Sequence, residues 1–473
     1  MDAQLSQLFP IALSSTHHAQ IREHLHSVRV GVVDSLLSNL DTPATAQRLG
    51  PRVGELHAFL SGLLELSAQS PERFGEIFGH WSLGLMLGSL MGPNPRDDFQ
   101  RDQLLSNICA LRLTQALEDK GSQGRFTTTS DFYDLLRDRR VRVQGADPKR
   151  VQWELAQGAV TLRAEGAQEP FAKLPLPLAT PGLAPHVSLE PLPRSEPWGV
   201  PIVDNRRLLS LLGSEQHDPD TGEPTAGWEP LTMKESTTAA HGIIKDLWPE
   251  VLDWAGALLT AFVDMNAPPR KSVHRSASYG AGSPIFLTRV DTPFKHAEDV
   301  VHELQHQRMF LTLNTSDYGL WHDSRQIFVS PYRSDPRPLQ GLHLGIHAFL
   351  AVNRFRLRVM ERMGFTPERR HHLFNLHRTN LFSFRTMLEH EQLSAHGRAV
   401  FVEYARELIS QHKLIEAFVT PEMNEAFNRR MGEHTDKVRA SGAALVNDSP
   451  DYMNWEQTVE KSIRFVKDEG GTL

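Results

Sequence analysis

The sequence predicts a mainly α-helical protein with a smaller β component, an α+β fold. Apolar residues recur at spacings of three and four near both ends of the 473-residue chain, which is typical of amphipathic helices. Between about 126 and 205 short alternating runs appear, and prolines then gather from Pro175 to Pro201. Alternation indicates short strands, and clustered prolines indicate extended chain.

Four segments are expected along the chain. They are an N-terminal helical region (1–125), a β-containing, proline-rich subdomain or insertion (126–230), a helical metal-binding catalytic domain (231–440) and a mostly polar C-terminal tail (441–473). Gln157-Gly158 separates two alternating runs and predicts a hairpin. Helices are predicted to open at Ser70-Pro71 and Thr292-Pro293, and to cover Ala239–Val263, Leu342–Met363, one or two stretches between Pro367 and Ile415, and Pro421–Val438.

The composition excludes several classes of protein. The single cysteine, Cys109, cannot form an internal disulfide and excludes four-cysteine zinc sites. A formal net charge of −7 without a basic block argues against nucleic-acid binding. No membrane span or secretory signal is expected, so a cytoplasmic location is predicted. The sequence does not predict an oligomeric state.

A candidate metal-binding motif occupies His302-Glu303-Leu304-Gln305-His306. Histidines four residues apart lie on one face of a helix and can reach one ion at about 2.0–2.2 Å. An apolar stripe at helical spacing supports the helix, and Glu298 and Asp299 are candidate acceptors for an imidazole N–H. The alternative is a solvated helix face with two ordinary histidines.

The third ligand would decide the class of enzyme. A metzincin is excluded because Met309 and Thr312 occupy the positions of its glycine and third histidine. A thermolysin-like site needs a downstream glutamate, and none occurs between Gln307 and Leu342. The next candidates are His343 and His347, although a buried structural histidine is an equally good interpretation of either one alone.

An arginine- and proline-rich loop, 329–339, precedes these histidines. It contains Arg333 and Arg337 among three prolines. A guanidinium is a natural receptor for a carboxylate, so the loop could bind an acidic small molecule. Structural pairing of an arginine with Asp335 is an equally good interpretation.

Four short runs together resemble a known family. In order, they are 302–306, Ser330-Pro331-Tyr332-Arg333, Asp335-Pro336-Arg337-Pro338 and Gly341-Leu342-His343. They resemble the HExxH-motif peptide-modification proteins of ribosomal peptide natural-product gene clusters. Characterised members of that family are iron(II)- and 2-oxoglutarate-dependent peptide β-hydroxylases. The resemblance runs from about 278 to 352, roughly a sixth of the chain.

The resemblance implies Fe(II) held by His302, His306 and His343, with 2-oxoglutarate and O₂ as co-substrates. It further implies that Arg333 or Arg337, beside Tyr332, binds the keto acid, and that the substrate is a β-carbon in a ribosomally made precursor peptide.

Three residues depart from the family pattern, and two other functions remain open. Tyr332 stands where tryptophan is expected, Leu344 where glycine is expected, and His347 where an aromatic is common, so His347 competes with His343. Glu303 is the candidate catalytic residue, as an orienting group or an additional ligand. In a zinc metallopeptidase, Glu303 would be the general base. The other alternative is a non-catalytic peptide-binding protein.

Overall fold

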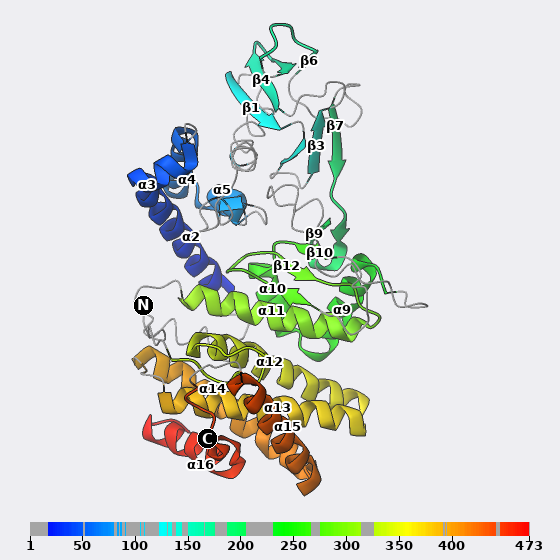
Figure 1. Cartoon of the computed structure of the whole chain (residues 1–473). Helices are drawn as coiled ribbons and strands as arrows, with labels where there is room; N and C mark the ends of the chain where they lie inside the picture. Colours follow the sequence, from blue (N-terminus) through cyan, green and yellow to red (C-terminus); the bar gives the residue numbers. More distant parts are fainter. Residues whose placement is uncertain are drawn as a thin grey trace. The chain divides into compact units, whose positions relative to one another are not determined.

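The described chain forms two compact units from interleaved segments (Figure 1). The computed structural model describes residues 18–50, 53–79, 123–129, 131–134, 139–143, 150–164, 166–175, 187–204, 230–265, 275–313, 326–390, 395–440 and 445–472, with a few single positions between 83 and 108 and at 393. A helical unit contains 239–258 and 293–473, and a mixed unit contains 23–238 and 259–292. Cys109 and residues 176–186 of the proline-rich stretch lie outside the described residues. The mainly α, α+β prediction is confirmed.

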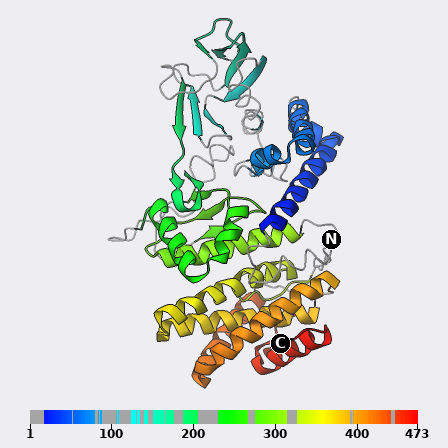
Figure 2. The same cartoon turned by 180° about the vertical axis from the view of Figure 1, so that it is seen from behind.

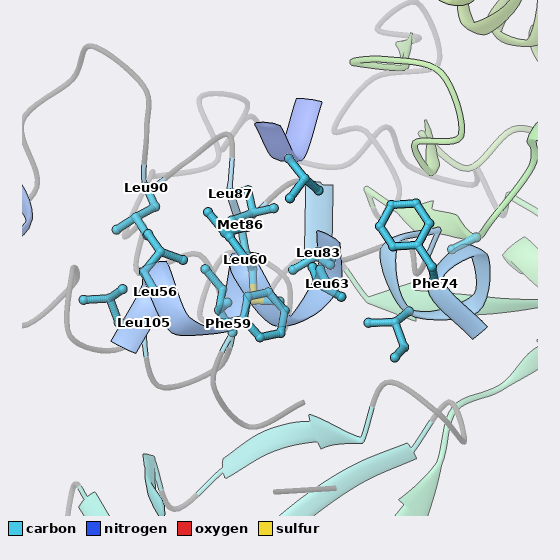
Figure 3. Close-up of a cluster of buried hydrophobic side chains, with 14 of the residues drawn as sticks. Leu56, Phe59, Leu60, Leu63, Phe74, Leu83, Met86, Leu87, Leu90 and Leu105 are labelled. Carbon is cyan, nitrogen blue, oxygen red and sulfur yellow. The ribbon is translucent and has the colours of Figure 1, made fainter. Parts of the chain in front are cut away.

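The N-terminal helices build a hydrophobic core within the mixed unit. They are α2 (His18–Leu40), α3 (Pro43–Leu49), α4 (Val53–Gln69) and α5 (Pro71–Phe78). Ser70 and Pro71 occupy the N-cap and first turn of α5, as predicted. The apolar stripe of α4 is buried against α5 and later residues (Figure 3), and the labelled members are Leu56, Phe59, Leu60, Leu63, Phe74, Leu83, Met86, Leu87, Leu90 and Leu105.

Two antiparallel sheets follow in the mixed unit. The first has the order β1-β4-β5-β6 and is formed by β1 (Gly124–Thr129), β4 (Arg150–Ala156), β5 (Ala159–Ala164) and β6 (Ala172–Pro175). Gln157 and Gly158 both have positive φ, 51° and 72°, and this tight turn confirms the predicted hairpin. The second sheet joins β2 (Asp131–Asp134), β3 (Arg139–Val143) and β7 (Val187–Pro191).

A five-stranded sheet, in the order β11-β12-β10-β9-β8, completes the mixed unit. Its strands are β8 (Arg194–Ser195), β9 (Val200–Asp204), β10 (Phe262–Asp264), β11 (Ser276–Ala277) and β12 (Ile285–Leu287), with the short helix η3 (Glu196–Trp198) between β8 and β9. The predicted helix over 239–263 is instead α9 (Met233–Leu247), α10 (Glu250–Leu258) and the start of β10. An apolar run buried on all sides has no periodicity that separates helix from strand, so the prediction missed this change.

Long helices dominate the helical unit. They are α11 (Pro293–Leu313), α12 (Leu339–Met363), α13 (Pro367–His390), α14 (Ala395–Ile415), α15 (Pro421–Arg439) and α16 (Trp455–Asp468), with the short helices η4 (Glu416–Phe418) and η5 (Pro450–Met453). α12 packs against both α11 and α13, and α16 packs against α13 and α14 (Figures 1 and 2). The predicted starts at three prolines and the predicted helix end at Met363, before Gly364 with φ 87°, are confirmed. Among the helices that the structure describes, none has the length and apolar character that crossing a bilayer demands.

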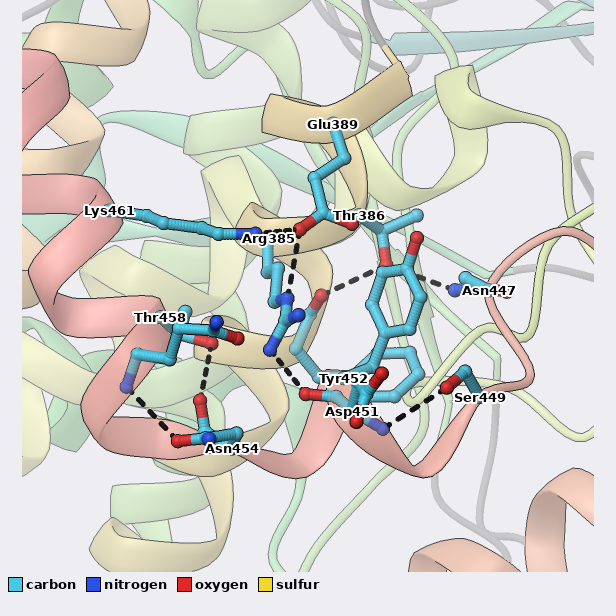
Figure 4. A network of polar contacts seen from close by, with 12 residues as sticks. Arg385, Thr386, Glu389, Asn447, Ser449, Asp451, Tyr452, Asn454, Thr458 and Lys461 are labelled. Atoms are coloured by element: carbon cyan, nitrogen blue, oxygen red, sulfur yellow. Dashed lines mark hydrogen bonds and ion pairs between the residues drawn. The ribbon is translucent and has the colours of Figure 1, made fainter.

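The C-terminal segment is attached to α13 by polar contacts (Figure 4). Glu389 accepts hydrogen bonds from Arg385 Nε at 3.0 Å and from Lys461 of α16. The Arg385 guanidinium also donates to the backbone carbonyl of Asp451. The buried Asn447 reaches Thr386 Oγ1 at 3.0 Å. These contacts, which a polar sequence pattern does not reveal, hold the segment 445–472 on the helical unit.

Replacing Asn447 by leucine should destabilise the protein. The Asn447 side chain accepts from the Val329 N–H at 2.7 Å and donates to the Val329 carbonyl at 3.2 Å. Each buried group left without a partner costs about 1–3 kcal/mol, so the free energy of unfolding should fall by at least about 2 kcal/mol. Urea denaturation would measure it, with the exposed Asn454→Leu at the N-cap of α16 as a comparison expected to lose about 1 kcal/mol. Equal losses in the two variants would contradict a special role for Asn447.

Candidate metal centre

The two histidines of the HExxH motif lie side by side on α11. Their Nε2 atoms are 2.9 Å apart, and their rings meet edge to face with centroids 4.5 Å apart. Two nitrogens that bind one ion at about 2.0–2.2 Å, at roughly a right angle, are about 3 Å apart. His302 and His306 therefore have the spacing that a shared metal ion requires.

Desolvation keeps both imidazoles of this pair neutral. The surrounding protein lowers the pKa of His306 from 6.5 to about 4. It also lowers the pKa of His302 well below 6.5, with a further contribution from His306 and an opposing one from Asp299. Among the described residues, His306 Nδ1 is buried and has no hydrogen-bond partner. A neutral imidazole is the form that binds a metal ion.

The acidic residues around the pair have different roles. Glu298, expected beside an imidazole, instead binds Arg356 of α12 through both oxygens, at 2.6 and 3.0 Å. Asp299 forms an ion pair with Lys295 at 3.1 Å, and its charge acts on His302. Glu303 is only 1% exposed, so its side chain is directed into the protein. Asp299 is therefore a carboxylate whose charge acts on His302.

The histidines of α12 meet at one tyrosine. His343 Nε2 is 3.0 Å, and His347 Nδ1 is 2.8 Å, from the hydroxyl of Tyr404 on α14. All three residues are buried. Burial is the main reason that the pKa of His343 falls to about 3 and that of His347 falls well below 6.5, the latter with contributions from Arg308, His343 and His306. In this arrangement both α12 histidines are neutral.

The structure does not bring a third ligand to the motif pair. Within the described ranges, no three histidine, cysteine, aspartate or glutamate side chains are grouped so as to hold an ion. His343, which the resemblance assigns as third ligand, is bonded to Tyr404. His347 lies close enough to His306 for their charges to interact, so the structure leaves His347 as a candidate beside His343.

The arginine loop is held by backbone hydrogen bonds and carries one surface ion pair. Arg337 Nε is 2.7 Å from Asp335 Oδ2, which is the structural pairing that the sequence left open. The Arg337 backbone is bonded to that of Phe328 in both directions, at 2.8 and 2.9 Å, which pins the loop before α12. Arg333 is exposed. Asp335 is itself 54% exposed, so the pair is a surface contact of small stability.

Tyr332 connects this loop to the histidine pair through an aromatic stack. Its ring lies on that of Phe349 with centroids 4.9 Å apart and planes 14° apart. Phe349 in turn contacts the ring of His302 at 4.6 Å. The Tyr332 hydroxyl donates to Asn380 Oδ1 at 2.8 Å. Tyr332 is thus linked to His302 through Phe349, which contacts both rings.

The stack depends on the absence of a side chain at Gly345. A Cβ atom there would lie 2.5 Å from Tyr332 Cδ2, so the ring would have to move. We expect Gly345→Ala to lower the free energy of unfolding by about 1–3 kcal/mol. Gly432→Ala, on α15, meets nothing within 4 Å and should stabilise by up to about 1 kcal/mol. Thermal and urea unfolding of the two variants would show opposite signs, and a stabilised Gly345→Ala would disprove the tight contact.

Three residues of this region were not predicted. Phe349 and Tyr404 contact the histidines across helix interfaces, and their spacing in the sequence carries no signal of this. Arg308 is 4% exposed, donates to Gln305 Oε1 at 2.8 Å and lies 4.1 Å from the Trp254 ring centroid. Burial lowers its pKa to about 9. The sequence alone does not show that this arginine is buried, because its burial becomes evident only when the apolar face of α11 is known.

Comparison with known proteins does not assign this chain to a family. No protein family and no curated protein sequence matches the chain. The arrangement itself offers two neutral nitrogens at ligand spacing, two further buried imidazoles on the neighbouring helix, and a loop arginine that already holds a carboxylate. In the part of the chain that the structure describes, these groups are not gathered into a three-ligand set.

Proposed function

We propose that this protein is an Fe(II)- and 2-oxoglutarate-dependent oxygenase that hydroxylates a β-carbon of a precursor peptide. The observation that carries the proposal is the pair of neutral imidazoles on α11, with Nε2 atoms 2.9 Å apart. His302 and His306 would hold the metal ion, and His343 or His347 would supply a third nitrogen. Imidazoles suit Fe(II), and a three-ligand set leaves open positions for co-substrates.

The remaining residues would bind and orient. Arg337 already binds the carboxylate of Asp335, and this surface pair could exchange for a carboxylate of the keto acid. Phe349 and Tyr332 would exclude water from one side of His302. When bound, Fe(II) with 2-oxoglutarate and O₂ would supply the oxidising power that places one oxygen atom in a C–H bond.

Two measurements test the proposal. Anaerobic addition of Fe(II) and 2-oxoglutarate should produce a metal-to-ligand absorption band, and subsequent aeration with a candidate peptide should give succinate and a peptide one oxygen atom heavier by mass spectrometry. The absence of both the band and succinate would overturn it. Substituting Zn²⁺ for Fe(II) serves as the matched control, because zinc has no redox chemistry.

The second candidate is a zinc metallopeptidase. It is favoured by the buried Glu303 directly after His302, the position of the general base in HExxH peptidases. Peptide cleavage that persists without oxygen and disappears in Glu303→Gln would support this function instead. A protein that binds peptide but takes up no stoichiometric metal would point to the third, non-catalytic alternative.

A further inference from the structure

A groove in the helical unit lies between α12, α14 and the end of α9. Its volume is about 510 Å³, which is in the range of ligand-binding sites in proteins. The helical part of its wall is the second half of α12, from Arg354 to Arg362, facing Glu407 to Leu414 of α14. The candidate metal centre contributes none of its lining residues, so the groove is a separate feature.

The floor of the groove is electrically neutral. Arg354 donates to both carboxylate oxygens of Glu407, with Nε 2.8 Å from Oε1. Glu407 is 5% exposed and also accepts from Gln411 at 2.7 Å. Leu357, 6% exposed, provides an apolar surface beside this pair. Because the charges of Arg354 and Glu407 are paired with each other, binding specificity has to come from the other lining residues.

Two arginines one helical turn apart offer positive charge to an occupant. Arg358 is held by neutral groups: its Nη1 donates to the Leu247 carbonyl at 2.9 Å, and its guanidinium lies 5.1 Å from the Trp248 ring centroid. Arg362 follows four residues later and is exposed. Within the part of the chain that the structure describes, neither guanidinium forms an ion pair. Arg358 is therefore a pre-positioned cation without a carboxylate partner there.

Negative charge also lines the groove. Asp246 and Glu361 are part of its wall, and neither forms an ion pair with any residue that the structure describes. A small anion placed between the arginines would also meet these carboxylates. A peptide can carry charges of both signs, and its amide N–H groups can donate to the carboxylates. It would therefore complement the wall better than a small anion does. This mixed character favours a peptide over a simple anion.

Exposed apolar side chains belong to the lining of the groove or follow it in the chain. Leu414, which lines the groove, is 50% exposed, and Met363 and Phe365, which follow the lining residue Arg362, are 47% and 40% exposed. Phe365 contacts Phe418, four residues after Leu414, with ring centroids 6.2 Å apart, so the apolar residues that follow α12 and α14 meet. Methionine, aromatic residues and arginine are enriched at protein interfaces. Exposed apolar side chains that border a charged groove are typical of peptide-docking surfaces.

We propose that this α12–α14 groove docks a short amphipathic peptide segment. An acidic side chain of the peptide would bind Arg358 and Arg362, and its apolar side chains would cover Leu414 and Phe365. The inference rests on the groove alone and does not depend on the chemistry at His302 and His306.

Selection from a random dodecapeptide library on the full-length protein tests this. Enriched peptides, labelled with fluorescein, should combine an acidic residue with apolar residues. Anisotropy should show at least about 10-fold weaker binding to Leu414→Asp and Arg362→Glu, as for residues at the centre of an interface. Both positions are exposed, so the variants should fold, and unchanged thermal unfolding verifies it. Arg429→Glu, an exposed arginine on α15, is the charge-matched control and should bind like the wild type.

Three results would overturn the proposal. The first is a selection that enriches no peptide. The second is a set of enriched peptides whose affinity is the same for wild type and both groove variants. The third is sedimentation showing a wild-type dimer that Leu414→Asp dissociates, because the exposed apolar side chains would then form an interface between copies of this chain.

Discussion

His306→Gln should remove stoichiometric metal binding from this protein. The substitution takes away one of two nitrogens that lie 2.9 Å apart, and leaves an amide in the same partly buried position. Changes next to a metal ligand already reduce affinity by about 10–100-fold, so loss of a ligand should cost at least about 100-fold. Titration with Fe(II) under anaerobic conditions, or with Co(II) followed by absorption, measures the affinity directly.

Measuring the unfolding of the variant with and without metal distinguishes loss of metal binding from loss of folding. If the wild type binds metal as proposed, metal at about 100 times its dissociation constant should stabilise it by about 2.7 kcal/mol. His306→Gln should unfold as a cooperative protein but gain nothing from added metal. His372→Gln, at an exposed histidine of α13, should retain the full gain. Equal metal affinity in wild type and His306→Gln would show that the pair on α11 is not a metal site.

Acid should destabilise the protein through a second histidine pair, away from the candidate centre. His377 Nε2 of α13 and His412 Nδ1 of α14 are 3.2 Å apart. Burial, the Arg378 charge and His412 lower the pKa of His377 well below 6.5. The pKa of His412 is lowered by burial and by Arg378, against the opposing charge of Glu416. The unfolded chain therefore takes up protons at a higher pH than the folded protein does.

The sign of the pH effect follows from these depressed pKa values. The stability due to neutral His377 is fully present above pH 6.5 and is lost as the pH falls below that value. Each proton bound only by the unfolded chain reduces the free energy of unfolding by up to about 1.4 kcal/mol per pH unit. Urea denaturation between pH 7 and pH 5 should show this slope, and His377→Gln should reduce it by about that amount. An unchanged slope in the variant would contradict the assignment, and the exposed His371→Gln is the control.

Local signals were sufficient for most of the fold. Prolines marked the starts of α11, α13 and α15, and Gln157-Gly158 marked the hairpin, because both act on backbone angles within a few residues. The start of β10 was wrongly assigned to the helix predicted over 239–263, because complete burial removes the periodicity. Helix α16 was not predicted because its segment is mostly polar. Trp455, Val459 and Val466 nevertheless lie on its buried face.

The candidate site was predictable only where it is local. The spacing of His302 and His306 dictated that they share one face of a helix, and the structure has them side by side. Contacts between helices were not predictable. Glu298 binds Arg356 of α12 instead of a histidine. Tyr404, about 60 residues beyond His343, binds both α12 imidazoles. Whether a third ligand joins the pair depends on such contacts.

The Tyr404 hydroxyl restricts which ring nitrogens of His343 and His347 carry a hydrogen. A hydroxyl carries a single hydrogen, yet His343 Nε2 and His347 Nδ1 both lie within 3.0 Å of its oxygen. At most one ring nitrogen can accept that hydrogen, so at least one imidazole must donate an N–H to the oxygen. The two imidazoles, alike in burial, therefore cannot both be acceptors at this oxygen. In every assignment both nitrogens are occupied, and a histidine that left to bind a metal through the same nitrogen would have to give up its bond to Tyr404.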